Sequence, residues 1–173
     1  MTWLPGRDVP TRLRAGVLAL AALGIVGTAV ELVFLRHWTS LTQLVVWPAI
    51  VALTVALVVL LGSVTPGRVT AARAIAGLVL VIAVLGVVLH VHANLEAGPL
   101  DRDYEVTWAT MSSLEQWWLA ITGGVGPAPV LAPGVLAEIS LALLLATVAH
   151  PVLAGDRPAE HRFPGDRGVL RTD

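Results

Sequence analysis

Apolar residues gather into four long runs that polar segments separate. The runs cover residues 15–35, 41–61, 71–92 and 133–149. A helix needs roughly 17–25 apolar residues to cross a bilayer, and each run meets that length. The pattern therefore predicts an all-α fold, an integral membrane four-helix bundle with four spans.

Local signals set the ends of these runs. Ser40 followed by Gln43 has the spacing of a capping box and predicts a helix start at residue 41. Pro48 lies inside the second run and predicts a kink. The segment 62–70 contains Pro-Gly and is typical of a turn. Pro133 suits a first helical position, and His150 followed by proline ends the fourth run.

The loop 93–132 contains a fifth pattern. Apolar side chains recur at helical spacing from residue 106 to residue 121, with serine, glutamate and glutamine between them. These apolar residues are Trp108, Met111, Leu114, Trp118 and Ile121. Such a segment is typical of an amphipathic helix that lies in the plane of the membrane interface. We therefore expect an interfacial helix over about 106–121.

Composition agrees with a membrane protein. Apolar residues make up 56% of the chain and charged residues only 13%, about half the usual share for a soluble domain. The net charge of −1 gives no global basic field for nucleic acid. The chain has no cysteine, which excludes disulfides, thiolate metal sites and cysteine nucleophiles.

The arginines predict an orientation. Nine fall on one side of the four predicted spans, and only Arg36 and Arg102 fall on the other. The positive-inside rule then places both termini in the cytoplasm of a bacterial inner membrane and the loop 93–132 outside. The first apolar run is too long for a signal peptide, so we expect it to be a retained span. Residues 1–14 are expected to form an irregular arm and 156–173 a disordered tail.

Three ionisable residues fall inside predicted spans on rows of small residues. Small residues mark close helix approaches, so we expect Glu31, His90 and Glu138 to face inward as a buried cluster. Their depths below the outer boundary are similar. The rows are Gly24–Thr28–Glu31, Ala76–Ala83–Gly86–His90 and Gly134–Glu138–Ala142. The cluster is either structural, with protonated carboxyls bonded across helix seams, or a proton-linked or metal-binding site.

Further polar residues lie just above this layer. His92 and Glu96 are four apart and share a helix face, and His37 ends the first run. Imidazole and carboxylate together suit a divalent metal such as zinc, iron, manganese or copper, so His37, His90, His92 and Glu96 are candidate ligands. Haem b held by His37 and His90 is a second option. The structural alternatives are an interfacial cap for His90 and a solvated pair for His92 and Glu96. His150 and His161 are expected to be exposed.

Part of the sequence resembles uncharacterised four-span bacterial membrane proteins. In these proteins the third span ends in histidine and Gly-Asn-x-Glu, and the fourth opens with Ala-Pro-Gly and closes near His-Pro. The matching residues are His90, Asn94, Glu96, Ala132, Pro133, Gly134, His150 and Pro151, while Ala93 replaces the glycine. The resemblance covers roughly the C-terminal half. It implies a four-helix membrane fold and no particular activity.

Three functions fit these patterns. Motifs for hydrolases, zinc peptidases and phosphate loops are absent from the sequence, which favours a non-enzymatic accessory or assembly subunit of a membrane complex. The alternatives are a metal- or haem-binding protein with a site at the outer leaflet, and a small proton-linked carrier that acts as an oligomer. The expected partners are the lipid bilayer and either other membrane subunits or further copies of this chain, without nucleic acid.

Overall fold

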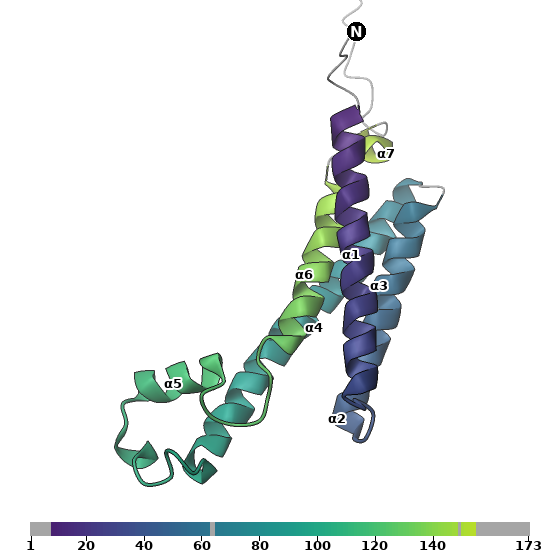
Figure 1. Cartoon of the computed structure of the whole chain (residues 1–173). Helices are drawn as coiled ribbons and strands as arrows, with labels where there is room; N and C mark the ends of the chain where they lie inside the picture. Colours follow the sequence, from purple (N-terminus) through teal and green to yellow (C-terminus); the bar gives the residue numbers. More distant parts are fainter. Residues whose placement is uncertain (1–7, 63–64, 149, 155–173) are drawn as a thin grey trace, which may run out of the picture.

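The computed structural model describes residues 8–62, 65–148 and 150–154, and these ranges are helical with no strand (Figure 1). The main helices are α1 (Asp8–Phe34), α3 (Val46–Leu61), α4 (Pro66–Ala97), α5 (Ser113–Thr122) and α6 (Ala132–Thr147). The shorter ones are α2 (Leu41–Leu44), α7 (Pro151–Ala154), and the 3₁₀ turns η1 (Gly98–Leu100) and η2 (Trp108–Thr110). The prediction of an all-α chain is confirmed.

Helices α1, α3, α4 and α6 contribute to one continuous apolar core. Leu53 of α3 and Ala76 of α4 are fully buried, and Leu143 of α6 is 1% exposed. Small residues set the closest approaches. A Cβ added at Gly24 of α1 would lie 2.8 Å from Cγ1 of Ile139, and one at Gly86 would lie 3.0 Å from Cβ of Pro133. Bulky side chains of α6 therefore pack against glycines of α1 and α4.

Among the described residues, two helices are long and apolar enough to cross a bilayer. They cover residues 10–34 and 66–100, the second of which includes η1. Helices α3 and α6 are also apolar but have only 16 residues each, about 24 Å at ~1.5 Å per residue. Each predicted span contains a helix, and the crossing of a membrane by all four remains a prediction.

The starts of α1 and α4 differ from expectation. Helix α1 begins at Asp8, so residues 8–14 are helical and not irregular. Helix α4 begins at Pro66, inside the segment predicted to be a turn, because the Thr65 side chain accepts a hydrogen bond from the Arg68 amide. Proline directly after such a cap is pre-organised for the first helical turn. The Pro-Gly pair thus starts a helix.

The second run is divided into two helices. Ser40 is the N-cap of α2, as predicted, with its side chain accepting from the Gln43 amide. The helix ends at Leu44, and α3 restarts at Val46 with Pro48 in its first turn. Proline lacks an amide donor and its ring clashes with the carbonyl four residues earlier, here that of Leu44. The helix is therefore interrupted at Val45 alone, where the backbone keeps helical dihedral angles, in agreement with the expected kink.

The predicted interfacial helix is shorter than expected. Residues 108–110 form η2, Met111 is extended, and α5 starts after the N-cap Ser112. Ser112 and Glu115 form a reciprocal capping box, and Gly123 ends the helix with a φ of 73°. The two backbone amides that the box satisfies explain why α5 starts at residue 113 and not at 106.

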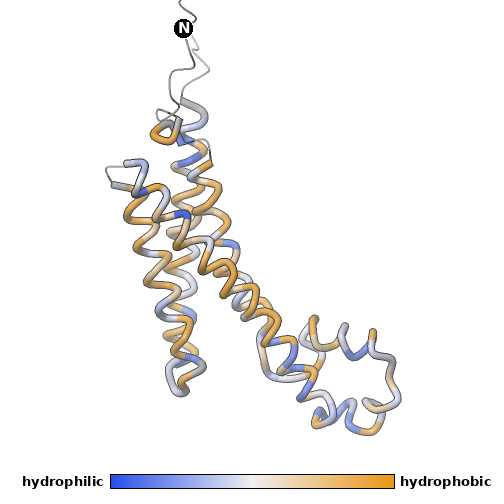
Figure 2. The backbone as a smooth tube through the Cα atoms, turned by 180° about the vertical axis from the view of Figure 1, so that it is seen from behind, coloured by the Kyte–Doolittle hydropathy of each residue, from blue (hydrophilic) through white to orange (hydrophobic). Residues whose placement is uncertain are grey.

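A second, smaller core lies outside the main one. It consists of Val91, Trp108, Ala120, Val125 and Val130. Gly98 lies so close to the Trp108 ring that any Cβ there would overlap it. Helix α5 and its flanking loops are thus held on the C-terminal end of α4. This outer module is more polar than the main helices (Figure 2).

The main helices separate toward the outer module. Both views show α4 and α6 diverging from α1 and α3 on the side of α2 and α5 (Figures 1 and 2). At the opposite end, Arg14 of α1 and Arg73 of α4 both bond to carbonyls in the last turn of α6. Hydrogen bonds therefore hold α1, α4 and α6 together at one end, whereas at the other end α4 and α6 separate from α1 and α3.

Candidate functional site

The predicted buried cluster of Glu31, His90 and Glu138 is not formed. Glu31 and Glu138 are exposed, and within the described ranges neither carboxylate has a hydrogen-bond or ion-pair partner. The C-terminal end of α1, which carries Glu31, also diverges from that of α4, which carries His90 (Figure 1). Glu31 and Glu138 are therefore corrected from inward-facing to surface residues.

The error on α6 has a physical cause. The expectation placed the small residues Gly134 and Ala142, and with them Glu138, in the helix seam. The structure instead buries the bulky residues Leu136, Ile139 and Leu143, and a Cβ at Gly134 would meet nothing within 4 Å. Small residues of one helix receive large residues of its neighbour, so the small row of α6 need not face the core.

On α4 the predicted row is correct. Ala76 and Ala83 are buried, Gly86 contacts Pro133, and His90 is half-buried. The Nδ1 atom of His90 lies 2.9 Å from the carbonyl oxygen of Pro129. A carbonyl only accepts, so Nδ1 carries the proton of this bond. His90 thus attaches α4 to the loop that leads into α6.

His92 and Glu96 form the predicted pair. The Nδ1 atom of His92 lies 3.4 Å from Oε1 of Glu96, and both side chains are exposed. An exposed pair of this kind contributes about 0.3–0.5 kcal/mol to stability when charged. This pair belongs to the solvated surface of the outer module.

The four candidate metal ligands do not converge. Among the residues that the structure describes, no three histidine, aspartate or glutamate side chains are arranged to hold an ion. His37 follows α1, and its carbonyl accepts a 2.8 Å hydrogen bond from Nε1 of Trp47. That end of α1 diverges from the end of α4 that carries His90 and His92 (Figure 2). The residues proposed for a metal or for haem b are therefore not assembled into one site.

Asn94 organises the outer module, a role that the sequence alone did not reveal. Its side chain is fully buried, and its Nδ2 donates to the carbonyls of Ala120 (3.1 Å) and Ala128 (2.9 Å). Its Oδ1 accepts from the amide of Ala128 at 2.9 Å. Gly126, at a φ of 76°, lies directly against it and leaves no room for a Cβ. Asn94 thereby connects α4, the end of α5 and the following loop.

A polar cluster lies at the opposite end of the main helices. Nε of Arg14 donates to the Ala146 carbonyl at 2.9 Å, and Arg73 donates to both oxygens of Thr147 at 2.8 and 2.9 Å. Cations at a helix C-terminus also offset the negative end of its dipole. Two arginines from different helices thus cap α6.

His150 belongs to this cluster, although the sequence suggested an exposed residue. It is only 8% exposed. Burial, and then the charges of Arg14 and Arg73, lower the pKa of His150. Its Nδ1 accepts a 3.4 Å bond from the Val152 amide, as a neutral imidazole can. His161 and the tail 156–173 lie outside the described residues.

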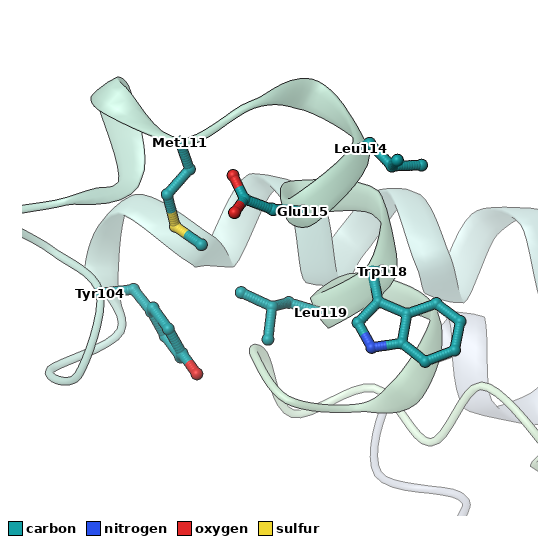
Figure 3. Close-up of a pocket in the computed structure, with 6 residues that line it drawn as sticks. All are labelled: Tyr104, Met111, Leu114, Glu115, Trp118 and Leu119. Atoms are coloured by element: carbon teal, nitrogen blue, oxygen red, sulfur yellow. The ribbon is translucent and has the colours of Figure 1, made fainter.

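Two surface depressions accompany these clusters. One, of about 430 Å³, lies in the outer module, where Tyr104, Met111 and Leu119 face one another beside Glu115 (Figure 3). Hydrogen bonds first from the Ser112 side chain and then from its backbone lower the pKa of Glu115, so this carboxylate serves as a helix cap. The other, of about 310 Å³, runs along α1 beside the end of α3. Both are open and predominantly apolar.

Comparison with known proteins adds no relative. The chain matches no protein-family model, no curated protein and no solved structure.

Proposed function

We propose that this chain is a multi-pass membrane protein that acts as a non-enzymatic subunit of a membrane complex. The observation that carries the proposal is the amount of apolar surface on the main helices. Leu20 and Leu23 of α1 are 67% and 69% exposed, and Leu89 of α4 is 67% exposed. A monomeric soluble protein rarely exposes continuous apolar surface of this kind. Lipid and protein partners are its natural environment.

The arrangement of charges supports one orientation in the membrane. The starts of α1 and α4 and the end of α6 lie together and carry Arg12, Arg14, Arg68 and Arg73. The other end has Arg36 and Arg102 alone. Under the positive-inside rule, the arginine-rich end is cytoplasmic and the outer module is external.

The surface of α5 supports contact between the outer module and the bilayer. Leu114, Trp117, Trp118 and Ile121 are 48–80% exposed and share an arc of about 100° at ~3.6 residues per turn. Helix α5 lies crosswise to α1, near the level of the C-terminal end of α1 (Figure 1). Tryptophan and leucine on such a face are typical of an interfacial helix.

The two exposed glutamates favour a protein partner over lipid alone. Glu138 lies near the middle of α6, between the exposed residues Val135 and Leu141. Hydrocarbon offers a carboxyl group no hydrogen bond, so intramembrane acids usually contact protein. We propose that another subunit provides that contact on the outer face of α6.

Two measurements test the membrane proposal and the subunit proposal separately. Integral insertion predicts that alkaline carbonate leaves the chain in the membrane pellet, and release into the supernatant would contradict it. Cross-linking in intact membranes followed by mild solubilisation should yield a specific larger complex. Glu138→Leu should reduce its yield, whereas Glu96→Leu in the exposed pair serves as the matched control. A chain that is always a lone monomer would refute the subunit role.

A second function, a proton-linked carrier that works as an oligomer, is favoured by the same exposed carboxyls. In this case Glu31 and Glu138 would take up and release protons at an interface between copies. Proton-coupled uptake into vesicles should then fall in Glu31→Gln and Glu138→Gln. Unchanged uptake in both variants would reject it.

A further inference from the structure

An open groove of about 310 Å³ lies at the arginine-rich end of the main helices. Its walls come from one face of α1 and from the last residue of α3. The lining residues are Thr11, Arg14, Ala15, Leu18, Ala19, Ala22 and Leu61. Apart from Thr11 and Arg14 these side chains are apolar. The groove therefore has a cationic upper part and an apolar floor.

The length of the groove matches one leaflet of a bilayer. Eight residues separate Arg14 from Ala22 along α1, about 12 Å at ~1.5 Å per residue. Half of the hydrocarbon core is roughly 15 Å thick. Ala15, Ala19 and Ala22 have short side chains that do not fill the groove, so it is open along this face of α1.

The cation at the upper end retains donors for a ligand. Arg14 is half-buried, and within the described ranges its one hydrogen bond runs from Nε to the Ala146 carbonyl. A guanidinium group has five N–H donors, so the two amino groups of Arg14 remain available. No carboxylate lines the groove, and Arg14 has no ion pair within the described ranges. Among the residues that the structure describes, no carboxylate therefore neutralises its positive charge.

We propose that this groove binds an anionic phospholipid of the cytoplasmic leaflet. The phosphate contacts the amino groups of Arg14, and one acyl chain lies along Leu18, Ala19 and Ala22. Basic pockets between membrane helices on the cytoplasmic side are suited to such headgroups. A zwitterionic lipid is a poorer ligand because the described lining residues offer its ammonium group no acid. The inference rests on the membrane insertion proposed above.

The test uses the full chain in nanodiscs of phosphatidylcholine mixed with phosphatidylglycerol. Native mass spectrometry after gentle release counts the lipids that each protein retains. The wild-type chain should retain phosphatidylglycerol preferentially, and Arg14→Gln should reduce that preference about five-fold, the usual contribution of one basic residue at an anionic surface. Ala19→Phe fills the groove without altering the charge and should reduce retention of both lipids.

Matched controls separate the groove from general effects. Leu20→Phe enlarges a side chain outside the groove and should behave like the wild type. Arg12→Gln removes an exposed arginine that does not line the groove, so it should reduce the preference less than Arg14→Gln does; an equal reduction would show a general surface effect and overturn the groove assignment. Glycerol phosphate should not displace the lipid, because it lacks acyl chains. Displacement by it would show that the groove binds a free anion and would overturn the lipid assignment.

The outcomes distinguish this inference from the membrane proposal. A chain that alkaline carbonate releases refutes insertion itself. A chain that stays inserted but retains both lipids equally refutes only the groove. Arg14 also caps α6, so tryptophan fluorescence must show that Arg14→Gln is folded. Ala19→Phe leaves that cap intact, and unchanged lipid retention in this variant would refute the groove even if Arg14→Gln failed to fold.

Discussion

Replacing Asn94 with alanine should release the outer module from α4 without unfolding the main helices. The substitution removes three hydrogen bonds, two to carbonyls and one from an amide. At a net value of about 1 kcal/mol per bond, the module loses about 3 kcal/mol. The small outer core of Val91, Trp108, Ala120, Val125 and Val130 provides few other contacts to offset this loss.

Hydrogen exchange with mass spectrometry gives the direct measurement. Peptides that cover residues 113–131 should lose protection in Asn94→Ala, because local opening becomes more frequent as local stability falls. Peptides from α1 and α3 should exchange as in the wild type. Emission of Trp108, which is 8% exposed in the folded chain, should shift to the red.

The control for this experiment lies on the same helix. His92→Ala removes an exposed partner of an exposed pair and should change exchange in residues 113–131 only slightly. Equal loss of protection in α1 and in the outer module would show that the two cores unfold together. Unchanged exchange in residues 113–131 would show that Asn94 does not hold the module.

Three further predictions concern other contacts. Gly24→Leu should destabilise the fold by about 1–3 kcal/mol and lower its melting temperature in detergent, because Ile139 occupies the space beside Gly24. The control Gly27→Leu should leave the melting temperature unchanged, because nothing lies within 4 Å of a Cβ at that position. Ser112→Ala should cost α5 about 1 kcal/mol through loss of its capping box, seen as faster exchange at its first turn. Because the pKa of His150 is lowered in the folded chain, the unfolded chain binds more protons, and the free energy of unfolding should fall as pH decreases below about 6.5. In thermal melts from pH 7 to pH 5, His150→Asn should weaken this dependence of stability on pH.

The helical elements were predictable because apolar runs and capping residues are local signals. Ser40 begins α2 and Gly123 ends α5, as the capping chemistry of serine and glycine predicts. The sequence predicts a turn at Pro66, whereas the structure starts α4 there. Proline favours both turns and first helical turns, and the hydrogen bond to the Thr65 side chain decides between them.

The candidate site was less predictable because it depends on how helices face one another. A row of small residues does not say which side of a helix is the seam. On α4 the row with Ala76 and Ala83 does face the core, whereas on α6 the row with Glu138 does not. Ile139 and Pro133 of α6 pack against Gly24 of α1 and Gly86 of α4, so these contacts depend on the relative placement of three helices. Contacts such as Arg14 with Ala146 span 132 residues of sequence and leave no local pattern.

Helix α4 runs without interruption for 32 residues, about 48 Å at ~1.5 Å per residue. It is therefore a lever that joins the arginine cluster at Thr147 to the outer module. If α4 pivots by about 10° at its first turn, its far end moves by roughly 8 Å over that ~48 Å length. The C-terminal end of α1 and the N-terminal end of α3 diverge from that far end and do not enclose it (Figure 1). A small change of tilt at the arginine-rich end of α4 would therefore become a large lateral displacement of α5.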